Sequence, residues 1–160
     1  MEHNKEIIKK FNLLDYSEKI NFLTNFEGDL DLDFANFLTE LSISRVHDDT
    51  LRIEAIKVIG LYKGQYNDRE MVNKLFSLVF SEDEDDEIKV YALNTLSFLE
   101  VGDNEIDLSK KIIKSDEYIL VKEAAFSLIS KHKKLPSARD ALYSIRDDEI
   151  FGKSAQRELN

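Results

Sequence analysis

One helical pattern recurs along this chain, and it limits the possible folds more than any other feature of the sequence. Its clearest copy lies in residues 85–100 (DDEIKVYALNTLSFLE), which contain no Gly or Pro. Apolar residues recur there at helical spacing, at Ile88, Ala92, Leu96 and Leu99. The small side chain of Ala92 lets a second helix come close. This stretch therefore predicts an amphipathic helix that packs tightly against another helix.

The pattern is an acid, an apolar anchor, a Lys or Arg, an Ala and two more apolar residues, and three further segments resemble it. Residues 48–59 match it fully, residues 116–129 match with their acids further from the anchor, and residues 147–159 match only in part, because Gly152 replaces the base and Gln156 an apolar residue. The anchors are Leu51, Ile88, Val121 and Phe151. They are separated by 37 (88 − 51), 33 (121 − 88) and 30 (151 − 121) residues, which indicates stacked two-helix units.

In these residues the chain resembles the HEAT-repeat family, over roughly residues 29–160. The signatures of tetratricopeptide and ankyrin repeats are absent. The units depart from the family by being shorter than the roughly 40 residues usual in HEAT arrays, and a Pro opens only one first helix, at Pro136. The resemblance implies an all-α fold: one domain over residues 1–160 that forms a right-handed HEAT-like α-solenoid of about five antiparallel helix pairs.

Periodic apolar residues and turn residues predict ten helices joined by short connectors. Ser17 is the predicted N-cap of the second helix, Asp31 or Asp33 opens the third, Gly64 ends the fourth and Pro136 opens the ninth. The predicted ranges are 4–14, 17–26, 31–41, 48 up to Gly64, 68–80, 86–100, 105–114, 117–132, 136–145 and 149–159. Five Gly and one Pro provide little turn chemistry for a many-stranded sheet.

The composition argues against several classes of site. The chain has no Cys, which excludes disulfides and thiolate metal sites, and its three His have no second ligand at metal-binding spacing. His47 stands beside Asp48, but in a connector such a pair is more typical of a surface and a helix cap than of a catalytic dyad. No apolar run approaches the length of a membrane span. We therefore expect no enzyme activity, no metal, no cofactor, no membrane contact and a cytoplasmic location.

Charge is the bulk property that says most about partners. The formal net charge is −10. Residues 1–108 hold 24 acids and 11 bases, net −13, and residues 109–160 hold 8 acids and 11 bases, net +3. Such an acidic surface repels the phosphate backbone of a nucleic acid, because a protein binds that backbone through clustered Lys and Arg side chains. We therefore expect no nucleic-acid partner.

A run of acids precedes the helix of the clearest copy. The run begins with Glu82, Asp83, Glu84, Asp85 and Asp86. It lacks the Gly and the ligand spacing of a calcium-binding EF-hand loop. One interpretation is a solvated loop with a helix start, since a cap and first-turn acids stabilise a helix. The other is a docking surface for a basic partner, because the run has more acids than a helix start needs.

In a stacked array of helix pairs, the starts of all second helices lie on one edge. That arrangement would place Asp48 and Asp49, the acidic run, Asp116 and Glu117, and residues 147–149 on an acidic ridge. The second helices would also line the inner curve, where Glu54 and Tyr91 are candidate contact residues. Tyr62 and Tyr66 are expected at the opposite edge. For each tyrosine, partly buried packing is an equally good interpretation.

Three functional classes follow. A small acidic protein with a rigid acidic face is similar to bacterial immunity proteins, which neutralise a cognate toxin whose nuclease domain is typically basic. By that similarity the chain would be a monomer before it binds a basic toxin domain. The alternative is an adaptor or scaffold that holds two proteins together. The third class, a subunit of a HEAT-type enzyme, has the least support because no set of catalytic groups is apparent.

Overall fold

The chain is all-helical in the computed structural model, which describes residues 2–61 and 69–160. Within these residues it forms ten α-helices and no strand, which confirms the all-α class. The predicted roles of Gly64 and Asp68 at helix ends, and the predicted positions of Tyr62 and Tyr66, lie outside the described residues.

The helices follow one another along the chain with short connections. Their bounds are α1 (Glu2–Leu13), α2 (Tyr16–Thr24), α3 (Leu32–Ile43), α4 (Asp49–Leu61), α5 (Arg69–Val79), α6 (Asp86–Leu96), α7 (Asp103–Ile113), α8 (Ile119–Lys131), α9 (Pro136–Ser144) and α10 (Gly152–Leu159). Among the described helices none combines the length and the apolar character that crossing a membrane requires.

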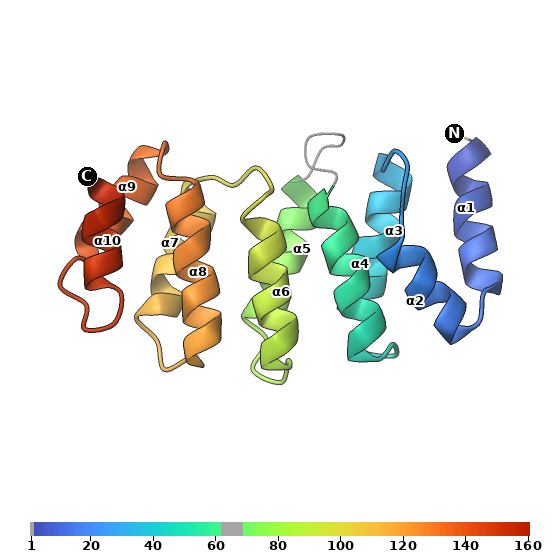
Figure 1. Ribbon diagram of the computed structural model, residues 1–160, viewed down its shortest axis with the longest axis horizontal. Helices are drawn as coiled ribbons and strands as arrows, with labels where there is room; N and C mark the ends of the chain where they lie inside the picture. The colour runs from blue at the N-terminus through green and yellow to red at the C-terminus, as the bar shows by residue number, and fades with distance from the viewer. Residues whose placement is uncertain (1, 62–68) are drawn as a thin grey trace.

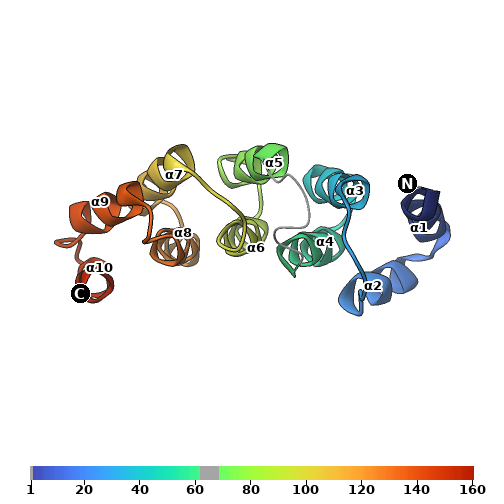
Figure 2. The ribbon, with the colours of Figure 1, turned by 90° about the horizontal axis from the view of Figure 1, so that it is seen from above.

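The helices lie in two rows. Figure 2 shows α1, α3, α5, α7 and α9 in one row and α2, α4, α6, α8 and α10 in the other, with the even-numbered row on the inner side of a shallow arc. Consecutive helices pack as α3 on α4, α5 on α6 and α7 on α8, and α6 also packs between α4 and α8. Figure 1 shows that the connections leading into α4, α6, α8 and α10 lie along one edge, the lower edge in that view.

Several helix ends differ from the prediction. Asp15, not Ser17, caps α2: its carboxylate accepts the backbone N–H of Glu18 at 2.8 Å, and Glu18 returns the contact in a capping box. α6 ends at Leu96 instead of residue 100, because Ser97 donates its hydroxyl to the Asn94 carbonyl at 2.6 Å and the chain then tightens into turns. Asp31 caps α3, and Pro136 opens α9 as predicted.

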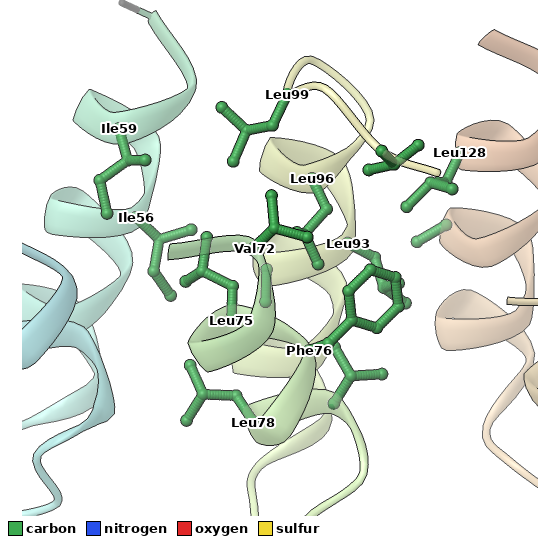
Figure 3. Close-up of a cluster of buried hydrophobic side chains, with 14 of the residues drawn as sticks. Ile56, Ile59, Val72, Leu75, Phe76, Leu78, Leu93, Leu96, Leu99 and Leu128 are labelled. Atoms are coloured by element: carbon green, nitrogen blue, oxygen red, sulfur yellow. The ribbon is translucent and has the colours of Figure 1, made fainter. Parts of the chain in front are cut away.

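The core is a continuous apolar layer between the two rows. Figure 3 shows its centre, where side chains of α4, α5, α6 and α8 meet, including Ile56, Phe76, Leu93 and Leu128. The Ala of each copy of the repeated pattern is fully buried; these residues are Ala55, Ala92, Ala125 and Ala155. Their burial confirms that the pattern marks helix faces in close contact.

Gly152, which departs from the pattern in the last copy, is required by close approach of the backbone. A Cβ atom built at this residue would lie 2.5 Å from the carbonyl oxygen of Arg146. The loop before α10 therefore folds back against the first residue of the helix. A base at this position would not fit the same conformation.

Candidate functional site

The connections that lead into α4, α6, α8 and α10 lie along one edge (Figure 1), and each of them contains exposed carboxylates or leads directly into them. We call this group the acidic edge. Its exposed members are Asp48, Asp49, Glu82, Asp83, Asp85, Asp86, Asp116, Asp147 and Glu149. They come from four separate regions of the sequence. The stacking of the helices in two rows places these four regions along one edge.

Part of the acidic edge serves local structure. The Asp48 carboxylate accepts the backbone N–H of Leu51 at 2.9 Å, and Asp85 accepts that of Glu87 at 2.9 Å. The hydrogen bond from Leu51 lowers the pKa of the Asp48 carboxyl below its usual value and outweighs the opposing effect of burial. Asp49 contacts Arg52 at 3.3 Å. These acids stabilise the first turns of α4 and α6 and remain exposed.

Four other members make no such contacts. The side chains of Glu82, Asp83, Asp86 and Asp116 are exposed, and none has a hydrogen bond or an ion pair with another described residue. Glu82 and Asp116 line one cavity of about 320 Å³ at this edge, together with the half-exposed ring of Phe80. Their charges are available to an outside group.

Glu84 corrects the expectation that the whole acidic run faces solvent. Its side chain is only 3% exposed and forms a two-point contact with Arg52, whose two terminal nitrogens donate to its oxygens at 3.0 and 2.7 Å. Arg52 also donates from Nε to the carbonyl oxygen of Ser42 at 2.8 Å. Arg45 lies 3.7 Å from the same carboxylate. Glu84 is thus an internal anchor, and its position removes it from the surface that a partner could touch.

The electrostatics of Glu84 agree with this anchor role. Burial by itself raises the pKa of the Glu84 carboxyl, but the hydrogen bonds from Arg52 and from the backbone N–H of Asp85, with the charges of Arg52 and Arg45, outweigh it. The pKa therefore lies below its usual value, and the carboxyl is ionised at neutral pH.

The base of the repeated pattern has the same role in the next copy. Lys89, which occupies the position of Arg52 in its own copy, is buried and donates to Glu117 at 2.9 Å. In both cases a base near the start of one even-numbered helix binds an acid in the connection before the next. Glu117 is therefore also partly used inside the molecule. In the third copy, Lys122 has no ion pair with a described residue.

Glu54 and Tyr91 lie on the even-numbered row as predicted for the inner curve, and both are half-buried. Glu54 accepts from Lys57 at 3.0 Å and from the Thr24 hydroxyl at 3.3 Å. The Lys57 ammonium lies 5.1 Å from the centre of the Tyr91 ring. Lys57 therefore joins the two predicted contact residues into one cluster between α4 and α6.

A groove of about 490 Å³ opens at this cluster, between the C-terminal halves of α4 and α6, and we call it the α4–α6 groove. Besides Lys57 it is lined by Gly60, Leu61, Tyr91, Asn94, Thr95 and Phe98. Of these the sequence singled out Tyr91 alone. Phe98 could have been noticed, because it is an apolar residue that lies off the buried stripe of residues 88–99 and is 47% exposed.

The histidines have structural surroundings. The ring nitrogens of His132 lie 2.8 Å from the Leu128 carbonyl oxygen and 3.0 Å from that of Leu99, so the ring joins the end of α8 to the segment after α6. His47 is half-buried before α4, and the side chain of His3 lies outside the described part of the chain. In that described part, no group of three or more His, Asp or Glu side chains is arranged to hold a metal ion.

Comparisons with protein-family models, with curated proteins and with solved structures found no match. Function is therefore inferred from the geometry of this chain alone.

Proposed function

We propose that this chain is a protein-binding module that acts as an immunity protein: it binds a basic, nuclease-type toxin domain in the cytoplasm and blocks it. In this proposal the fold is a right-handed HEAT-like α-solenoid of five antiparallel helix pairs, monomeric until it meets its partner. The two rows of helices and the buried Ala of each copy support the solenoid part of the proposal.

The acidic edge is the observation that carries the binding proposal. Glu82, Asp83 and Asp116 project charge that no described residue neutralises. Unpaired exposed carboxylates on a rigid support attract a partner with clustered Lys and Arg and exclude acidic molecules, including nucleic acids. A basic protein domain is the class of partner that meets both conditions.

An adaptor is the second candidate function, and a separate observation favours it. The α4–α6 groove is mostly apolar and lies toward the opposite ends of the helices from the acidic edge, since Leu61 ends α4 and Phe98 follows α6, whereas the acids lie at or before the first residues of these helices. Two surfaces of different chemistry allow two partners to bind together. An immunity protein needs only one partner.

The test is to purify the native complex from the source cells and to identify what accompanies the chain in equal amount. The immunity proposal expects one basic domain whose toxic activity returns when the chain is removed. Two unrelated partners in one complex would support the adaptor instead. A purified complex that contains only an acidic partner would contradict a role for the acidic edge.

A pair of matched variants then locates the binding surface. Glu82→Gln with Asp83→Asn removes two charges from the acidic edge, and we expect affinity for the basic partner to fall by about five- to tenfold. Glu27→Gln with Asp29→Asn removes the same two charges from the exposed turn before α3 and should change affinity by less than about twofold. Equal losses in both variants would show only a dependence on net charge.

A further inference from the structure

The floor of the α4–α6 groove is formed before any ligand arrives. Thr95 is buried and donates its hydroxyl to the carbonyl oxygen of Ile56 at 3.0 Å, which fixes α6 against α4. Gly60 faces it closely, because a Cβ atom at this residue would lie 3.0 Å from the Thr95 hydroxyl oxygen. The absence of a side chain at Gly60 therefore allows α4 and α6 to approach each other closely at the floor of the groove.

The walls of the groove expose apolar surface on the concave side of the molecule. Leu61 is 71% exposed and Phe98 is 47% exposed, and the half-buried ring of Tyr91 lies beside them in the same groove. Large apolar side chains gathered in a preformed hollow are typical of a binding site, whereas single exposed ones are not. Asn94 adds an amide whose side chain has no hydrogen bond to a described residue, so it can both donate and accept.

Among the described residues, Lys131 brings an unpaired positive charge to the border of the groove, opposite in sign to the acidic edge, while Lys57 within the groove is paired with Glu54. The Lys131 ammonium of α8 lies 3.9 Å from the centre of the Phe98 ring and 3.3 Å from the Ser97 hydroxyl, and no carboxylate of a described residue pairs with it. Lys57 lies over Tyr91 and donates to Glu54, which leaves further ammonium protons for a second acceptor. Within a chain of net charge −10, this apolar groove is bordered by two cations.

We propose that the α4–α6 groove binds an extended acidic and apolar segment of a partner protein, with one large apolar side chain in the hollow and carboxylates on Lys131 and Lys57. This inference goes beyond the proposed toxin-binding function, because it concerns a different surface and a segment of opposite charge. Its occupant is a peptide segment, since Asn94 offers the donor and the acceptor that a peptide backbone matches.

The spacing of the groove indicates the form of the segment. Tyr91 lies five residues, roughly 7.5 Å along the helix axis, before the last residue of α6, Phe98 lies two residues beyond that end, and each has one of the two lysines over its ring. An extended chain places residues i, i+2 and i+4 on one face over about 13 Å. A segment of the form Asp-x-Phe-x-Asp therefore presents its ring between two carboxylates that reach the two lysines.

The experiment titrates the full chain with the blocked peptide Gly-Asp-Ser-Phe-Ser-Asp-Gly and records the NMR signals of the Asn94 side-chain amide and of the backbone amides of Gly60 and Thr95. We expect all three to shift together, with a dissociation constant on the order of 1 mM. The matched peptide with Lys in place of both Asp should produce shift changes of the three signals that are at least about fivefold smaller at equal peptide concentration.

Two variants separate this site from general charge effects. Lys131→Glu should lower the affinity for the acidic peptide by about fivefold or more. Lys114→Glu is an equal charge change at an exposed residue at the end of α7, and it should change this affinity by less than about twofold. No shift of the three signals, equal binding of the basic peptide, or equal weakening by Lys114→Glu would each overturn the inference. The variant Glu82→Gln with Asp83→Asn should bind the acidic peptide with the affinity of the wild type. The test of the α4–α6 groove is therefore independent of the test of basic-partner binding at the acidic edge.

Discussion

At the scale of single residues, the most consequential contact is the buried pair of Arg52 and Glu84. The desolvation of two charges is costly. The pair is tolerated because the two terminal nitrogens of the Arg52 guanidinium donate to both oxygens of Glu84, and its Nε donates to the Ser42 carbonyl oxygen. Removal of one partner leaves the other charge buried with only a weaker ion pair, to Asp49 at 3.3 Å for Arg52 or to Arg45 at 3.7 Å for Glu84. The pair therefore fixes the connection before α6 to the start of α4.

The variant Glu84→Gln should be strongly destabilised. It leaves the buried Arg52 charge with only the exposed carboxylate of Asp49, at 3.3 Å, as an ion-pair partner, so we expect a loss of about 2 to 4 kcal/mol in the free energy of unfolding, measured by urea denaturation. Glu82→Gln is the matched control two residues away in the same acidic run, and it should change stability by less than about 0.5 kcal/mol. Similar small effects of both changes would mean that Glu84 is exposed in solution.

The same carboxylate predicts a pH dependence of stability. Its pKa in the folded chain lies below the usual 4.5, so in the range between these two values the unfolded chain binds more protons than the folded one. The stabilisation by Glu84 is therefore complete above about pH 5 and is lost as the pH falls through the folded pKa. The difference in urea midpoint between the wild type and Glu84→Gln should shrink from neutral pH to about pH 3. A constant difference over that range would contradict the lowered pKa.

At the scale of elements, the helices are fitted to one another by the small residue on each even-numbered helix. α6 packs between α4 and α8, and Ala92 on it has no exposed surface. A larger side chain there must displace a neighbouring helix, since protein cores are close-packed. The same requirement explains Ala55 and Ala125 on the two neighbours, which are equally buried.

The variant Ala92→Leu should therefore overpack the contact and lower the free energy of unfolding by about 1 to 3 kcal/mol. Glu123→Leu, which adds a Leu at an exposed position of α8, is the control and should change stability by less than about 0.5 kcal/mol. The measurement is the thermal midpoint of each variant by circular dichroism. An unchanged midpoint for Ala92→Leu would place this residue at the surface and contradict the helix packing described above.

At the scale of the whole molecule, charge is distributed unevenly. Residues 1–108 carry net −13 (24 acids, 11 bases) and residues 109–160 carry net +3 (8 acids, 11 bases). An uneven field orients an approaching charged partner before contact and speeds its association, and salt screens this effect. Short-range contacts determine how slowly the complex dissociates.

We expect association with a basic partner to slow by about tenfold or more between about 50 mM and about 500 mM salt, with a much smaller change in the dissociation rate. The variant Glu82→Gln with Asp83→Asn should weaken the salt dependence of association in stopped-flow or surface-binding kinetics. Its melting midpoint should stay near that of the wild type, because neither side chain has a hydrogen bond or an ion pair with a described residue. A dissociation rate that carries most of the salt effect would contradict steering by the acidic edge.

The sequence by itself determined the helical elements and their buried faces. Apolar spacing and the absence of Gly or Pro identify α6, and Pro136 identifies the start of α9. The repeated Ala identified positions that are fully buried in the core. These properties are local, because helix periodicity and backbone restrictions act over a few residues. The cap of α2 was misplaced because Asp15 and Ser17 are both suitable caps, and only the capping box with Glu18 distinguishes them.

The tertiary structure alone decided which acids face outward and where the groove lies. Glu82, Asp83 and Glu84 are consecutive and chemically similar, yet one of them is buried because Arg52, 32 residues earlier, comes to lie beside it. The α4–α6 groove likewise joins residues of separate helices, with a cation from α8 at its border. The pattern of one helix gives its own buried face, but the partner of each side chain depends on how the rows of helices stack, which no single stretch of the sequence contains.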